Sequence, residues 1–143
     1  MKTRKILITV FTIAVFAFIF TACKKDDSRK DYYGTWTFSG FGTRLVFSAD
    51  KFSFVDELND LGFSISPITW TAVENAFEET KDDYPTGYKI TGTVLEHHGN
   101  IAGWHTGTYF DEDWAFFIHT DRQKMIEQGL NRFWYQELMK VAE

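Results

Sequence analysis

Apolar and polar residues alternate along most of this chain. Trp36 and Phe38 are separated by Thr37, and Phe52 and Phe54 flank a single serine. A period of two places apolar side chains on one face of a β-strand and polar side chains on the other. Threonine and aromatic residues, which favour strands, are frequent in the same segments. The pattern therefore predicts an all-β domain.

Turn-forming residues divide this region into strand-like segments. These segments are 33–39, 44–48, 51–55, 63–73, 88–95, 103–110, 114–120 and 132–141. About eight antiparallel strands can avoid exposed edges by closing into an up-and-down barrel, which is the fold we expect. Pro67 indicates a bulge or a sheet edge within its segment.

Two segments also fit a helical period. They are 71–80 and 122–139, and both carry apolar residues at spacings of three and four. We interpret the end of the second as a strand, preceded by a turn at 129–131. Both alternatives stay open at this point.

The N-terminal segment has the layout of a secretory signal peptide. Lys2, Arg4 and Lys5 precede the uncharged run from Ile6 to Ala22, which ends at Cys23, the only cysteine. The run just reaches the length of a membrane span, so an uncleaved transmembrane anchor is the alternative. Because there is one cysteine, no disulfide can form within the chain.

The sequence around Cys23 resembles the lipobox of bacterial lipoproteins. The resemblance implies cleavage before Cys23, diacylglycerol on its sulfur and an acyl chain such as palmitate on its new amine. We therefore expect 1–22 to be the signal peptide, 23–31 the lipidated cysteine with a polar tether, and 32–143 the barrel domain. The expected location is the bacterial cell envelope, anchored to the outer membrane and periplasmic or surface-exposed.

The charge of the chain argues against nucleic-acid binding. Asp and Glu number 20 against 15 Lys and Arg, and three of the basic residues precede the lipobox. A domain this acidic repels phosphate backbones. The lipid on Cys23, and not a basic surface, would hold it at the membrane.

The start of the predicted domain resembles the lipocalins and related lipocalin-like (calycin-type) bacterial lipoproteins. Gly34-Thr35-Trp36 matches their Gly-X-Trp signature. The resemblance implies a barrel whose tryptophan sits at the closed end, with an arginine from near the last strand packed over it. Arg132 is the matching candidate, and Arg122 is the second.

Aromatic side chains supply the candidate binding site. The chain has 15 Phe, 6 Tyr and 5 Trp, and a barrel of this size either fills its interior or encloses one small ligand. The residues expected to point inward and to contact a ligand are Trp36, Phe54, Trp70, Tyr88, Trp104, Trp114 and Phe116.

We expect no bound metal and no cofactor. The candidate metal ligands are His97, His105 and His119. They would form a row across three strands if the numbers of paired residues add up to 202 across the turn between Leu95 and Trp104, and to 224 across the turn at 111–113. Separate surface histidines are the simpler interpretation. No nucleophile motif or phosphate-binding glycine loop is present, so we expect a protein that is not an enzyme.

Two functions remain from different classes. The first is a cell-envelope lipoprotein whose barrel binds a small, largely apolar ligand. The alternative is a scaffold barrel that binds another protein through its outer face or loops, with Tyr109 and Phe117 as outward-facing candidates.

Overall fold

A computed structural model describes residues 25–38, 42–101 and 103–142. The expected signal peptide and Cys23 lie outside these residues. The elements are a 3₁₀ helix, η1 (Lys25–Tyr32), and ten strands, β1 (Gly34–Phe38), β2 (Thr43–Phe47), β3 (Phe52–Asp56), β4 (Leu61–Ile65), β5 (Thr69–Glu74), β6 (Thr86–His98), β7 (Tyr109–Asp111), β8 (Trp114–Ile118), β9 (Lys124–Gly129) and β10 (Tyr135–Lys140).

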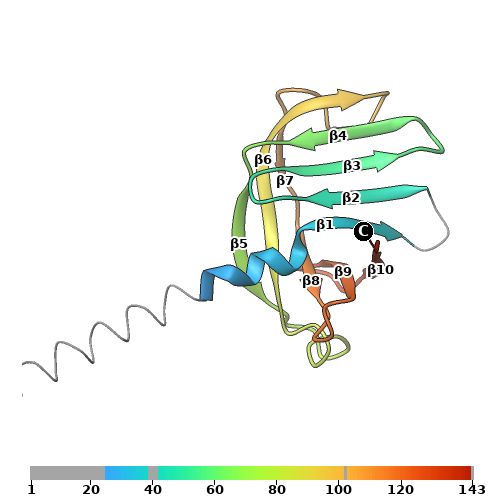
Figure 1. The fold of residues 1–143 in the computed structure, drawn as a ribbon. Helices are drawn as coiled ribbons and strands as arrows, with labels where there is room; N and C mark the ends of the chain where they lie inside the picture. The colour runs from blue at the N-terminus through green and yellow to red at the C-terminus, as the bar shows by residue number, and fades with distance from the viewer. Residues whose placement is uncertain (1–24, 39–41, 102, 143) are drawn as a thin grey trace, which may run out of the picture. The chain divides into compact units, whose positions relative to one another are not determined.

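The strands form one antiparallel sheet that closes on itself. Neighbouring strands follow the order β4-β3-β2-β1-β10-β9-β8-β6, and β4 pairs with β6 to complete an eight-stranded ring. Strands β5 and β7 pair with the long strand β6 in addition. Figure 1 shows β1 to β4 side by side in this sheet. The predicted all-β, antiparallel up-and-down barrel is confirmed.

The strand boundaries differ from the prediction in several places. Of the predicted segment 103–110, only Tyr109 and Phe110 belong to a strand, β7, and β9 lies outside all eight predicted segments. The segment 63–73 is divided into β4 and β5 around Pro67, which has no N–H to donate to a ladder. The segment 122–139 forms β9 and β10, so its helical alternative is wrong. The segment 71–80 is also not helical, because β5 continues to Glu74 and a loop follows.

The barrel interior is filled with aromatic rings over most of its length. All seven residues predicted to face inward belong to one apolar cluster, in which Trp36 and Phe116 are buried and the other five are half-buried. Neighbouring rings meet edge to face or tilted, and one edge-to-face pair is Trp114 and Phe116, whose centroids are 5.2 Å apart at 90°. The inward orientation of this set is confirmed.

One end of the barrel is closed by Tyr32 and Trp36. The Trp36 indole Nε1 donates to the carbonyl of Tyr32 at 2.9 Å. The Tyr32 hydroxyl accepts from the Ile118 N–H at 3.2 Å and donates to the Phe116 carbonyl at 3.4 Å. Burial raises the pKa of this phenol far above its usual value, so it stays protonated.

The cation over Trp36 is Lys140, and the expectation of Arg132 is therefore corrected. Lys140 is the cross-strand partner of Trp36 on β10, which brings the two side chains to the same face. Arg132 is exposed in the turn between β9 and β10, and Arg122 pairs with Asp31 at 3.1 Å.

A second apolar cluster lies on the outer face of β8 and β9. Its buried residues are Tyr84, Ala115, Phe117 and Ile126. Beside it, the buried amide of Gln128 accepts from Thr80 and donates to Asn75, which ties the loop after β5 to β9. Strand β9 is therefore covered on both faces.

Candidate ligand-binding cavity

A cavity of about 780 Å³ lies where β1 ends and β2 begins. It is lined by Phe38, Thr43, Phe54, Glu127, Tyr135, Gln136 and Glu137. Phe38 is at the opposite end of β1 from Gly34, and it pairs with Leu138 while Trp36 pairs with Lys140. The cavity therefore occupies the barrel end opposite the one that Tyr32 and Trp36 close.

Glu127 points into this cavity because of its position in β9. Met125 belongs to the interior cluster and Ile126 to the outer cluster, so the alternation of the strand turns Glu127 inward again. Its cross-strand partners are Phe116 on β8 and Gln136 on β10. A carboxyl group thus stands between an aromatic core and an open cavity.

The surroundings of Glu127 favour its neutral form. Burial raises the pKa of the Glu127 carboxyl to about 7. Among the residues that the structure describes, none donates a hydrogen bond to this carboxyl or forms an ion pair with it. Both protonation states are therefore populated near neutral pH, and the group is available to a ligand.

Of the seven predicted ligand-binding residues, one lies at the cavity and six lie in the filled interior of the barrel. Phe54 lines the cavity. The other six pack against one another in the interior, as Trp70 and Tyr88 do with ring centroids 5.4 Å apart. These rings fill the part of the barrel interior that lies next to the cavity.

Sequence reasoning missed Glu127 and Gln136. Met125, Ile126 and Gln128 are all buried, and Glu127 is half-buried. Because both faces of β9 are covered, the strand lacks the exposed polar positions by which a period of two is recognised. The sequence did contain one signal for Glu127, which is its position as an acidic residue inside a run otherwise suited to burial.

The three candidate histidines do not come together. The rings of His97 and His105 are 5.4 Å apart, and the pairing of Thr93 with Tyr109 follows the predicted register of the first turn. His119 instead contacts Tyr84 and lies 3.0 Å from Asp121, because β8 pairs with β6 and not in the expected register with β7. In the described part of the chain, no group of three His, Cys, Asp or Glu residues could hold a metal ion.

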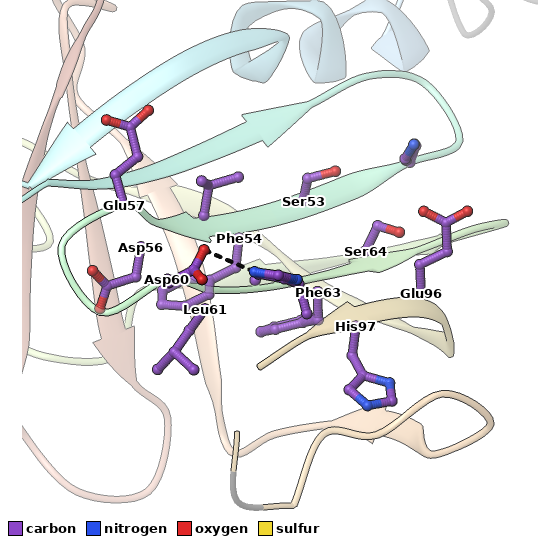
Figure 2. Close-up of a pocket in the computed structure, with 14 residues that line it drawn as sticks. Ser53, Phe54, Asp56, Glu57, Asp60, Leu61, Phe63, Ser64, Glu96 and His97 are labelled. Carbon is purple, nitrogen blue, oxygen red and sulfur yellow. Dashed lines mark hydrogen bonds and ion pairs between the residues drawn. The ribbon is translucent and has the colours of Figure 1, made fainter. Parts of the chain in front are cut away.

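A second hollow, of about 440 Å³, lies on the outer face of β3, β4 and β6. Figure 2 shows Ser53, Ser64 and Glu96 in a row across these strands, as the register requires. The Ser64 hydroxyl is buried, and no residue of the described ranges hydrogen-bonds to it. Asp60, however, already pairs with His98 at 2.7 Å.

The outer hollow is the weaker candidate of the two. Glu57, another of its carboxylates, pairs with Arg44, so part of its charge is already neutralised. Its lining combines charged and polar side chains with the rings of Phe54 and Phe63. The barrel cavity is larger, and it contains a carboxyl for which no partner is seen in the described chain, so it is the better candidate for a specific ligand.

No protein-family model, curated protein or solved structure matches this chain. Within residues 25–38, 42–101 and 103–142, no helix has the length and apolar character needed to cross a membrane.

Proposed function

We propose that this protein is a lipid-anchored protein of the bacterial cell envelope whose barrel binds a small, largely apolar ligand. The cavity carries the proposal, because its volume of about 780 Å³ falls within the range of roughly 300–1,000 Å³ found for small-molecule sites. Phe38 and Phe54 offer aromatic walls. Thr43, Gln136 and Glu127 offer a few polar groups that orient a ligand.

The anchor is supported by the sequence before the barrel. Cys23 follows an uncharged run and precedes the polar stretch from Lys24 to Asp31. Two or more long acyl chains hold a protein stably on a membrane. Metabolic labelling with a palmitate analogue is expected to label the wild-type chain, and Cys23→Ser is expected to abolish the label. Labelling that persists in Cys23→Ser would exclude this anchor.

Ligand binding is tested with the full chain in nanodiscs of zwitterionic lipid, using tryptophol, a neutral and water-soluble indole alcohol. Ligand-observed NMR is expected to show binding above that of empty nanodiscs. Gln136→Trp places a large ring in the cavity and is expected to weaken binding at least tenfold. The matched control is Val46→Trp, at an exposed position of β2, which is expected to leave binding unchanged.

The proposal fails if tryptophol does not bind the wild-type protein. It also fails if Val46→Trp and Gln136→Trp weaken binding equally, because the probe would then lie outside the barrel. Circular dichroism of each variant separates a lost site from a lost fold.

A second candidate function is protein binding through the outer face. Phe133 and Tyr135 are about half exposed, and their rings are 5.8 Å apart. Phe133 also lies 5.3 Å from the ring of Phe77. This exposed aromatic row supports an interaction surface. Of the residues expected to carry one, Tyr109 is exposed, whereas Phe117 is buried beneath the loop after β5.

A photo-crosslinking amino acid tests the second candidate. Placed at Phe133 in cells, it is expected to give one defined adduct with another protein. The control position is Leu58, the most exposed large apolar residue of the described chain at 74%. Equal, diffuse adducts at both positions would count against a specific partner.

A further inference from the structure

We infer that the ligand of the barrel cavity carries a cationic amine beside its apolar body, and that Glu127 is the residue that binds this amine. The inference rests on the proposed function, because it needs the cavity to hold a small molecule. It goes further by giving the chemical class of that molecule.

The charges around the cavity disfavour an anionic ligand. No lysine, arginine or histidine is among the described residues that line it. The titratable groups there are Glu127, Glu137 and Tyr135. Glu137 is the cross-strand partner of Ile126, whose side chain belongs to the outer cluster, so Glu127 supplies the charge on the inner side. A fatty-acid carboxylate would meet like charge and no counter-ion.

An amine matches what Glu127 lacks. The ionised carboxylate has no donor or counter-ion among the residues described, and an unpaired charge away from water is strongly unfavourable. An ammonium group supplies both a positive charge and N–H donors, which makes the strong, charge-assisted form of a hydrogen bond. A neutral ligand would leave the charged form of Glu127 without a counter-ion.

The aromatic walls favour the same class of ligand. Phe38 and Phe54 line the cavity together with Glu127, and Phe54 stacks on Phe63 with centroids 5.4 Å apart. Aromatic faces attract cations, most strongly where water is excluded. Gln136, the cross-strand partner of Glu127, adds an amide oxygen that accepts a further N–H.

Three isosteric probes test the inference on the full chain in zwitterionic nanodiscs. They are tryptamine, tryptophol and indole-3-acetate, which share an indole ring and differ in carrying a cation, a neutral hydroxyl or an anion. At pH 8 the expected affinity order is tryptamine, then tryptophol, then indole-3-acetate, with tryptamine at least tenfold tighter than tryptophol. Glu127→Gln is expected to lower the affinity for tryptamine to that for tryptophol, because the amide carries no charge.

A matched control separates the position of Glu127 from the net charge of the protein. Glu57→Gln removes an exposed carboxylate outside this cavity and is expected to preserve the tryptamine preference. Empty nanodiscs correct for binding of the cation to lipid.

The outcomes separate the two proposals. If tryptophol binds and tryptamine has no advantage, or if Glu127→Gln keeps that advantage, the amine inference is overturned while the binding function stands. If none of the three probes binds, both are overturned. Tighter binding of indole-3-acetate would contradict the charge argument directly.

Discussion

The Nζ atom of Lys140 lies 5.5 Å from the ring centroid of Trp36, at the closed end of the barrel. The two residues are cross-strand partners on β10 and β1. A cation over an indole contributes about 0.5–1 kcal/mol at a partly exposed site. Lys140→Met keeps the aliphatic stem and is expected to lower the free energy of unfolding by about this amount. Chemical denaturation measures it, and Arg132→Ala is the control with no expected change. A larger loss in Arg132→Ala would restore the arginine as the cation.

Glu127 is expected to make the barrel less stable as pH rises. Its pKa of about 7 in the folded chain exceeds its ordinary value of 4.5, so the folded state binds more protons than the unfolded state between these values. The contribution of Glu127 to stability is therefore greatest below pH 4.5 and is lost as pH rises through 7. The shift corresponds to about 3 kcal/mol.

Glu127→Gln isolates this effect from all other carboxylates. The variant is expected to match the wild-type stability at pH 4 and to exceed it by about 3 kcal/mol at pH 8. Denaturant titrations at a series of pH values measure the difference. Parallel curves for the two proteins would show that Glu127 does not titrate abnormally.

The affinity for tryptamine is expected to rise with pH. The amine stays protonated between pH 6 and 8, whereas Glu127, with a pKa of about 7, goes from mostly neutral to mostly ionised. The apparent dissociation constant scales inversely with the binding-competent fraction, so the gain is about tenfold. Glu137 and Tyr135 are the other titratable residues lining the cavity. Tryptophol, measured in parallel, is expected to show no such rise.

Tyr32→Phe is expected to destabilise the closed end. In the wild-type protein the Ile118 N–H donates to the Tyr32 oxygen at 3.2 Å. The substitution removes this acceptor. Burying an unsatisfied donor costs about 1–3 kcal/mol. Thermal and chemical unfolding measure the loss. Tyr33→Phe is the matched control, because the neighbouring ring contacts Trp70 and no hydrogen bond of its hydroxyl is seen in the described chain. Equal losses in both variants would point to a general effect of the helix end.

The period of two was enough to predict the closed barrel and the inward side of its aromatic residues. The register assumed for the first turn of the histidine row, with paired residue numbers adding up to 202, is also the one in which β6 pairs with β7. The period of two failed at β9, where a loop covers the outer face and Gln128 is buried in hydrogen bonds to Asn75 and Thr80. It also failed for the cation over Trp36, since only the register of β10 on β1 makes Lys140 the partner.

The burial of β9 on both faces has a consequence for how the cavity behaves. The amides of this strand are bonded to β8 and β10 and shielded by the interior on one side and by the loop after β5 on the other. We expect them to be among the slowest in the chain to exchange with deuterium, at rates set by global unfolding. Glu127 is carried by this strand, so the backbone that positions its carboxyl is held by both neighbouring strands and covered on both faces. The proposed contact with an amine would therefore require little rearrangement of β9.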